Sequence, residues 1–212
     1  MLLAFDTATA AVTVALHDGD RVLASSTRLD AMRHGELLAP GITAVLAEAG
    51  VVRQDLTAVA VGVGPGPFTG LRVGLVTART LGAVLEIPVY GVCTLDVLAV
   101  EAVDSGAVTG PFLVATDARR KEVYWASYDD QGVRLDGPHV SKPDQVRTDG
   151  PVVGRGAVLY PEAFPHAVGP ELPDAVVLAQ ALAEERVVPL DPEPLYLRRP
   201  DAAAPGKPKK VS

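Results

Sequence analysis

Cysteine is almost absent from this sequence, and aromatic residues are scarce. The chain of 212 residues holds one cysteine, which excludes an intramolecular disulfide and fits a reducing environment. Without a second thiol, Cys93 is expected to be a small buried apolar residue rather than a metal ligand. Aromatic residues make up only 5% of the chain, so the core must rest on valine, leucine and alanine. That composition suits a sheet rich in parallel strands.

Positive charge is also in short supply. The chain has 19 Lys and Arg against 26 Asp and Glu, a net charge of −7, and its only dense basic run is "KPKK" near the end. Nothing resembles a basic stripe for nucleic acid, so any RNA contact is expected to come only through a partner. The N-terminus lacks the basic region of a signal peptide, and no stretch of ~18 apolar residues is free of charges or Pro/Gly clusters. We therefore expect no membrane helix and a cytoplasmic location.

The pattern of apolar and turn residues predicts the order β-β-β-α-β-α-β-α in the first half of the chain. Strands are expected at residues 2–5, 11–17, 21–26, 56–63 and 87–92. Helices are expected at residues 34–49, 70–85 and 94–103, and again near 174–185. The first helix should kink or restart at Pro40 and end at Gly50. The expected N-caps of the later helices are Thr69, Thr94 and Asp174.

The second half of the chain repeats the first. When the sequence is shifted along itself, Asp6 falls on Asp117 and the apolar alternation that follows each acid also matches. This self-similarity predicts two duplicated β-β-β-α-β-α lobes, over residues 1–104 and 111–200, with a disordered tail over 201–212. A duplicated α/β unit of this kind is the plan of the actin-like ATPase (ribonuclease H-like) fold. That analogy concerns the fold and not the function.

An actin-like nucleotide site would use a hairpin from each lobe to hold phosphates. The first hairpin here is "DTATAAV", in which Asp6, Thr7 and Thr9 are candidate ligands for a nucleotide. An acid that caps a turn at the end of a strand is the equal alternative for Asp6. The second hairpin, "DARRKEVY", has bulky side chains at residues 119–122, where glycines would let the backbone approach a phosphate. No cofactor is therefore assigned to the chain itself.

The glycine- and proline-rich loop "GPGPFTGLR" does not supply a phosphate cradle either. It lacks the Gly-Lys-Ser/Thr ending of a P-loop, and Pro65 and Pro67 have no N–H to donate. The four histidines form no metal-binding pattern, and no GxSxG elbow is present. The sequence predicts no catalytic residue and no metal ligand.

The helices expected at residues 34–49 and 70–85 have almost no polar side. In the second of them the only charges are Arg72 and Arg79, which share one narrow stripe. Helices that are apolar nearly all round need cover on two sides, which favours a surface for another subunit. The alternative, that the helices pack only on each other and on the sheet, stays open. The residues predicted to contact a partner are Leu37, Leu38, Ile42, Val45, Leu71, Arg72, Gly74, Leu75, Ala78, Arg79 and Gly82.

Several stretches of the chain together resemble one known family. They are "LLAFDTAT", "VAVGVGPGPFTGLRVGLVTARTLG", "IPVYGVCTLDVLA", "DARRKEVYWASY" and "PEPLYLRRP". The resemblance extends to about residue 200 and is to the TsaB (YeaZ) family, the dimerisation subunits of the bacterial machinery that makes threonylcarbamoyladenosine in tRNA. "GPGPFTGLRVG" is its most specific piece. This family belongs to the same superfamily as the catalytic TsaD subunits.

The resemblance implies a non-catalytic scaffold that pairs with a TsaD-type transferase, joined by a TsaE-type ATPase, and supports N6-threonylcarbamoylation of adenosine 37. It implies that helices 34–49 and 70–85 form the contact, that copies of the chain can self-associate there, and that tRNA is met only through the complex. ATP and magnesium are used by the complex, and a nucleotide site at the subunit junction stays open. TsaD holds a metal with a histidine pair where this chain has Thr94 and Leu98, so the chemistry is expected in the partner.

Two other function classes stay open on the sequence alone. The first is an ATP-binding phosphotransferase or ATPase of the actin-like fold that uses Asp6 and Thr9. The second is a metallopeptidase of the same superfamily. Magnesium-dependent ATP binding that is lost in Asp6→Ala would favour the first, and a metal assay on the purified protein would test the second.

Overall fold

The computed structural model describes residues 1–198, and the tail expected at residues 201–212 lies outside the described part. The first sheet has five strands in the order β3-β2-β1-β4-β5. They are β1 (Leu2–Asp6), β2 (Ala11–His17), β3 (Val22–Leu29), β4 (Ala58–Gly62) and β5 (Val89–Val92). β1 pairs antiparallel with β2 and parallel with β4. All five strands expected in this half of the chain are confirmed.

The second sheet repeats this arrangement in the order β10-β9-β6-β7-β8. Its strands are β6 (Phe112–Asp117), β7 (Val123–Tyr128), β8 (Arg134–Ser141), β9 (Val152–Val153) and β10 (Ala167–Val168). β6 pairs antiparallel with β7 and parallel with β9, as β1 does with β2 and β4. The predicted duplication is confirmed, and the chain has an α/β actin-like fold. The repeat is incomplete, because a short 3-10 helix (Pro143–Gln145) stands where the first unit has a full helix.

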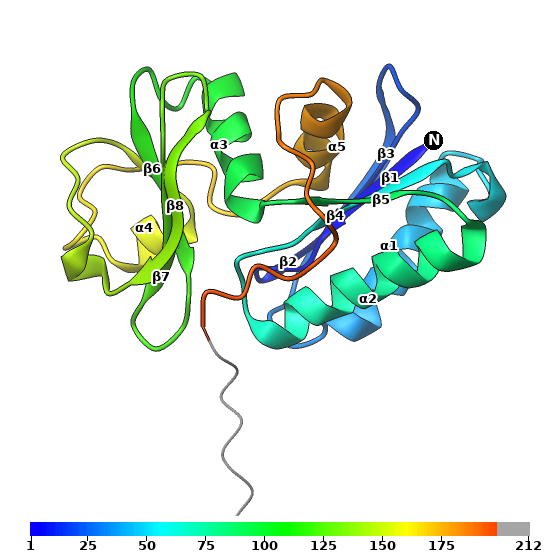
Figure 1. The fold of residues 1–212 in the computed structure, drawn as a ribbon, viewed down its shortest axis with the longest axis horizontal. Coiled ribbons are helices and arrows are strands. Elements are labelled where there is room, and N and C mark those ends of the chain that lie inside the picture. The colour runs from blue at the N-terminus through cyan, green and yellow to red at the C-terminus, as the bar shows by residue number, and fades with distance from the viewer. Residues whose placement is uncertain (199–212) are drawn as a thin grey trace, which may run out of the picture.

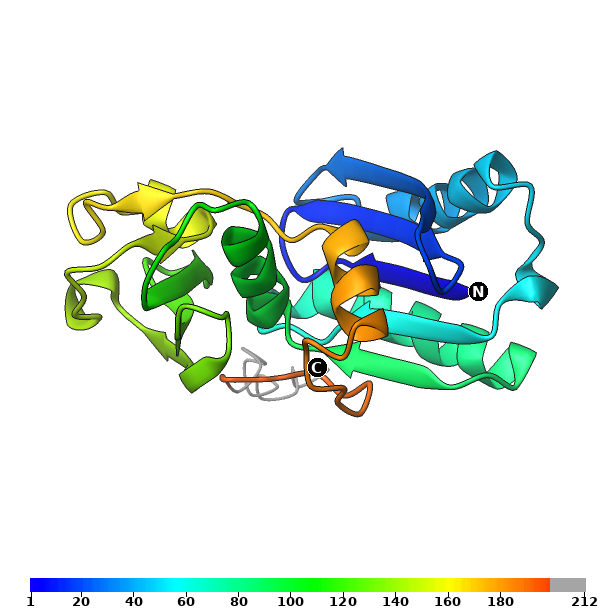
Figure 2. The ribbon, with the colours of Figure 1, turned by 90° about the horizontal axis from the view of Figure 1, so that it is seen from above.

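Helices cover the sheets in a crossed pattern. They are α1 (His34–Glu48), α2 (Phe68–Leu85), α3 (Thr94–Asp104), α4 (Arg155–Leu159) and α5 (Ala175–Ala183). α1 and α2 lie on one face of the first sheet and α5 lies on the other, as Figure 1 and Figure 2 show. α3 follows β5 of the first sheet but packs on the second sheet, through Leu95 and Leu98. The last helix of each unit thus covers the sheet of the other unit. The predicted lobe boundaries, residues 1–104 and 111–200, stay predictions.

β1 shows why the central strands carry apolar residues throughout. Successive side chains of a strand point to opposite faces of its sheet. Leu3 and Phe5 belong to the core beneath α1 and α2, whereas Ala4 belongs to the core beneath α5. All three are fully buried, since both faces of the sheet are covered. This burial on two sides explains the short aliphatic runs that predicted the strands.

The helix ends differ from expectation at two caps. α2 begins at Phe68 with Pro67 as N-cap, and α3 begins at Thr94 with Cys93 as N-cap, so the predicted caps Thr69 and Thr94 are wrong. α1 runs unbroken through Pro40, so the helix does not restart there, and the alternative, a kink, stays a prediction. Two other expected ends are confirmed. Gly50, at φ +66°, ends α1, and the Asp174 side chain accepts a hydrogen bond from the Val176 N–H at 2.8 Å.

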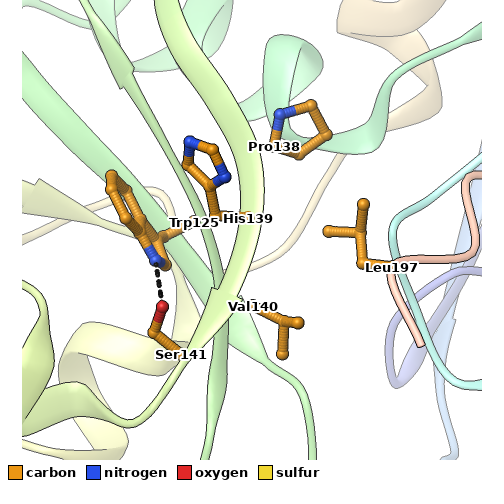
Figure 3. A pocket seen from close by; sticks show the side chains of 6 residues that line it. All are labelled: Trp125, Pro138, His139, Val140, Ser141 and Leu197. Atoms are coloured by element: carbon orange, nitrogen blue, oxygen red, sulfur yellow. Dashed lines mark hydrogen bonds between the residues drawn. The ribbon is translucent and has the colours of Figure 1, made fainter.

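The C-terminal segment, residues 189–198, returns across both lobes. It pairs with the edge strand β5, where Gly91 and Leu190 exchange backbone hydrogen bonds of 2.8 Å. The Leu195 N–H then donates to the Val63 carbonyl at 2.9 Å. Farther on, Leu197 reaches a hollow at the edge of β8, lined also by Trp125, Pro138, His139, Val140 and Ser141 (Figure 3). The segment therefore connects the first sheet to the second.

α2 is the one described helix that is long and apolar enough to cross a membrane, judged by length and composition alone. Its inner side packs on β4 and on α1, as the core helix of a two-layer fold does. A single helix of this kind is weak evidence for a membrane span.

Candidate subunit interface

Most side chains predicted to contact a partner are buried inside the chain itself. Leu37 is half-buried and the two arginines are exposed. The eight buried residues are Leu38, Ile42, Val45, Leu71, Gly74, Leu75, Ala78 and Gly82. These eight side chains pack inside the chain, and their contact with a partner stays a prediction. Both stripes of α2 are apolar, so hydrophobicity alone does not tell which of them faces the sheet.

The glycines of α2 serve the same internal packing. They were expected to let a partner helix come close. A Cβ at Gly74 would lie 2.5 Å from the Thr7 Oγ1, and a Cβ at Gly82 would lie 2.3 Å from a methyl group of Val89. Both contacts are shorter than real Cβ atoms tolerate. The missing side chains therefore let α2 lie close to the first sheet and its loops. The close approach of a partner helix at these glycines stays a prediction.

The two arginines of α2 bind the chain's own C-terminal segment. The Arg79 Nε donates to the Pro192 carbonyl at 2.8 Å, and its guanidinium forms an ion pair with Glu193. The Arg72 Nε donates to the Tyr196 hydroxyl at 3.1 Å. The same guanidinium lies over the Phe68 ring, 3.8 Å from its centroid, and Phe68 stacks on Tyr196. The charges on the helix are thus engaged inside the chain.

What remains outside on α2 is an uncharged surface, which we call the outer face of α2. Val76 is 62% exposed and Val84 is 72% exposed. The hydroxyls of Thr77 and Thr80 each donate to a carbonyl of their own helix at 2.8 Å, so both hydroxyls are engaged within α2. The members of the outer face are Phe68, Thr69, Val73, Val76, Thr77, Thr80, Ala83 and Val84.

The outer face of α2 is also slightly hollowed and continues toward α1. Phe68, Thr69, Arg72, Val73, Val76 and Thr77 line a shallow depression on it. On α1, Ala39, Thr43 and Ala44 are exposed, and the Thr43 hydroxyl bonds the Ala39 carbonyl at 3.0 Å. Both helices therefore expose small apolar and threonine side chains. The sequence analysis noted that this side of the helix is also uncharged, but it assigned the contact to the residues of the other stripe.

Asp6 lies at the end of β1 in the interior, not at an open cleft. Its Oδ1 accepts from the Ala8 N–H at 2.6 Å and its Oδ2 accepts from the Thr94 hydroxyl at 2.7 Å. Burial raises the pKa of Asp6 to about 6, against the lowering effect of these hydrogen bonds. The backbone of Gly62 packs directly on this carboxylate, because a Cβ there would lie 1.9 Å from the Oδ2. This is the geometry of an acid that caps a turn.

The other two candidate nucleotide ligands also have partners within the chain. The Thr7 hydroxyl donates to the Gly70 carbonyl at 2.8 Å and accepts from the Gly74 N–H at 3.1 Å, which ties the first hairpin to α2. Thr9 accepts from the Ala11 N–H at 3.1 Å through its hydroxyl, and its carbonyl bonds His34. Thr9 alone reaches the surface, in a hollow at the start of α1 and α2. Nucleotide binding by these residues stays a prediction.

Cys93 is fully buried, as predicted, and burial raises the pKa of its thiol to about 12. It belongs to a polar group that sequence reasoning missed. The Tyr128 hydroxyl donates to the Asp96 Oδ1 at 2.8 Å, and Arg134 lies 3.5 Å from the other Asp96 oxygen. Burial raises the pKa of Asp96, which the arginine opposes. These contacts fix α3 on the second sheet.

Within residues 1–198, no group of three His, Cys, Asp or Glu side chains is placed to hold a metal ion. Thr94 and Leu98 are the residues aligned with the histidine pair of TsaD. Both are fully buried, and the Thr94 hydroxyl donates a hydrogen bond to Asp6. The metallopeptidase alternative stays a prediction.

Comparison with known proteins gives a consistent result. The family model for TsaD, tRNA N6-adenosine threonylcarbamoyltransferase, matches residues 26–162. The tRNA threonylcarbamoyladenosine biosynthesis protein TsaB of Escherichia coli is 33% identical over 227 aligned positions. The match covers 93% of this chain and 94% of the Escherichia coli protein. An uncharacterized protein of Mycobacterium tuberculosis is 45% identical, covering 95% of this chain and 93% of its own. A Mycobacterium leprae relative, 44% identical, is longer, and the match spans 56% of it.

Solved structures agree with these sequence matches. YeaZ from Pseudomonas aeruginosa superposes with a TM-score of 0.77 at 34% identity, covering 92% of this chain and 99% of that one. A second Pseudomonas aeruginosa structure, of a protein described as similar to peptidase YeaZ, gives a TM-score of 0.79 at 33% identity, covering 93% and 99%. Together with the duplicated actin-like topology, these similarities establish that the chain belongs to the TsaB (YeaZ) family of the TsaD superfamily.

Proposed function

We propose that this chain is a non-catalytic scaffold subunit that pairs with a TsaD-type threonylcarbamoyltransferase and supports N6-threonylcarbamoylation of adenosine 37 in tRNA. Its relatives are named for the biosynthesis of threonylcarbamoyladenosine in tRNA, and the TsaD model matches more than half of the chain. Work on tRNA inside the cell accords with a cytoplasmic location. A TsaE-type ATPase completes the assembly in this proposal.

The observation that carries the proposal is the outer face of α2. A helix of 18 residues is about 27 Å long, enough to line a contact of roughly 800 Å² on each partner. Exposed apolar area costs ~25 cal/mol for each Å² that stays in water, so a continuous uncharged face favours association. The hydroxyls of two of its three threonines, Thr77 and Thr80, donate to carbonyls of their own helix.

The proposed occupant is the TsaD-type subunit, presenting a pair of apolar helices. The TsaD model matches residues 26–162, which include both α1 and α2, so the partner is expected to carry a related helical pair. Two such pairs can pack as a four-helix contact through ridges and grooves. Self-association of this chain through the same face is the competing outcome, and the heterodimer should suppress it.

The scaffold role is supported by the hairpin between β1 and β2, where an actin-like ATPase would hold its nucleotide. Asp6 and Thr7 are buried and use their side-chain oxygens on Ala8, Thr94 and Gly70. Ligands for magnesium or phosphate must face the site, and these do not. In this proposal ATP and magnesium act in the partner subunits, and a nucleotide at the junction would be held mainly by them.

The direct test is reconstitution from purified subunits of the same organism. We expect the chain to form a stable complex with the TsaD-type subunit, measured by light scattering after size-exclusion chromatography. Transfer of the threonylcarbamoyl group to a tRNA transcript should be lost when this chain is omitted. Full transfer without it, or no complex between the two proteins, would contradict the proposal.

A further inference from the structure

The turn between β6 and β7 has an unusual backbone. Arg119, Arg120 and Lys121 follow one another with φ of 60°, 54° and 61°. The left-handed region is disfavoured for any residue with a Cβ, and glycine is the residue that normally fills it. The chain instead keeps three long basic side chains in this conformation. Strain that persists where glycine would relieve it points to a role for the side chains.

The turn is also a local excess of positive charge in an acidic protein. All three side chains are exposed. The two neighbouring acids are both engaged. Asp117 accepts from the Arg119 N–H at 2.8 Å and lies 3.6 Å from the Arg119 Nε, and Glu122 forms an ion pair with Arg198. Arg198 also donates to the Ala118 carbonyl at 3.1 Å, which adds a fourth cation. Four cations against two acids contrast with the net charge of −7 for the whole chain.

The turn lies beside the proposed subunit junction. Arg119 lines the same hollow as Thr9, Thr69 and Val73. Thr69 and Val73 also line the depression on the outer face of α2. The basic turn therefore borders the surface on which we place the TsaD-type subunit, and the β6–β7 end of the second sheet lies on the side where α2 begins (Figure 1).

We propose that this turn contacts backbone phosphates of the tRNA bound by the heterodimer. The proposal rests on the proposed function. Long basic side chains on an exposed turn are suited to phosphate oxygens and carry no pattern for reading base edges. They would position the tRNA at the junction without selecting its sequence. The chain's low overall positive charge does not conflict with this role, because a few well-placed cations suffice when a partner supplies the rest.

The test uses the heterodimer and a tRNA transcript with an anticodon that reads codons beginning with A. Arg119→Gly combined with Lys121→Gly removes two cations and also relaxes the left-handed backbone, so the thermal midpoint should be no lower than that of wild type. Each phosphate contact contributes to the salt dependence of binding. We expect the affinity for tRNA to fall about tenfold or more at moderate salt, and the slope of log K against log salt to decrease by about one to two.

The matched control is Arg21→Ala combined with Arg53→Ala, which removes two exposed cations from the first lobe. It should leave the affinity and the salt slope near those of wild type. An equal loss in the control, or unchanged affinity in the turn variant, would overturn the proposal. So would a turn variant that loses binding of a free nucleotide but keeps tRNA. A wild-type chain that forms no complex with the TsaD-type subunit would instead refute the proposed function, which separates the two failures.

Discussion

The Nε of Arg79, in the middle of α2, lies 2.8 Å from the carbonyl oxygen of Pro192 in the C-terminal segment. Arg79, which the sequence analysis assigned to the subunit interface, therefore binds the C-terminal segment of its own chain. Together with the contact of Arg72 to Tyr196, it pairs both charged side chains of α2 with the C-terminal segment, although the two arginines remain exposed. The outer face of α2 itself carries no charged side chain.

Arg79→Ala should loosen the C-terminal segment without unfolding the sheets. The variant loses the bond to Pro192 and the ion pair with Glu193, both at an exposed site, so we expect a loss of about 1 kcal/mol in the free energy of unfolding. Amide hydrogen exchange at Leu190 and Leu195 should quicken. Arg53→Ala is the control for charge. Unchanged exchange at both amides would show that the segment is held by other contacts.

Gly74→Ala should destabilise the protein although alanine is a better helix former. Its Cβ would meet the Thr7 Oγ1 at 2.5 Å and disturb the hydrogen bonds of that hydroxyl. We expect a cost of roughly 1–3 kcal/mol in urea denaturation. Gly110→Ala is the matched control, since nothing lies within 4 Å of a Cβ there. A Gly74 variant as stable as its control would mean that α2 can move off the first hairpin at no cost.

Asp6 should give the folding free energy a dependence on pH. Its pKa rises from 3.8 to about 6 on folding, mainly because burial disfavours the charged form. Because the folded protein binds this proton more tightly than the unfolded chain does, protonation of Asp6 stabilises the fold. That stabilisation is fully present below pH 4 and is lost as the pH rises through about 6. The shift corresponds to roughly 3 kcal/mol as an order of magnitude.

Asp6→Asn is the variant that isolates this effect. Glu101, whose pKa burial raises to about 7, titrates in an overlapping window, so the wild-type profile must be compared with that of the variant. The difference in unfolding free energy between the two should change between pH 4 and pH 6 and level off on either side. A constant difference across that range would show that Asp6 has an ordinary pKa in the folded protein.

Much of the fold could be predicted from the sequence because its signals are local. Alternation and helical periodicity predicted the strands and helices, and the repeat between Asp6 and Asp117 predicted two sheets of one topology. The direction of α2 could not be predicted in this way. Leu75 faces the core and Val76 faces solvent, yet both are aliphatic, so neither stripe is marked as the inner one.

Contacts between distant parts of the chain also escaped prediction. The bond between Asp6 and Thr94 joins residues 88 positions apart, and it turns a supposed helix cap into the partner of a buried acid. The C-terminal segment has no periodic pattern, so its pairing with Gly91 left no signal in the sequence. These long-range contacts decide which candidate residues are open to a ligand and which are already engaged.

The central claim is that the outer face of α2 binds the TsaD-type subunit, and Val76→Glu tests it most directly. Val76 is 62% exposed, so the variant should fold as wild type does, with an unchanged thermal midpoint. Val133→Glu is the control, because Val133 is 59% exposed on the second lobe, away from α2. The measurement is the dissociation constant for the TsaD-type subunit. We predict that it rises at least a hundredfold for Val76→Glu and stays within threefold of wild type for Val133→Glu. A folded Val76→Glu protein that binds the partner as tightly as wild type would contradict the account.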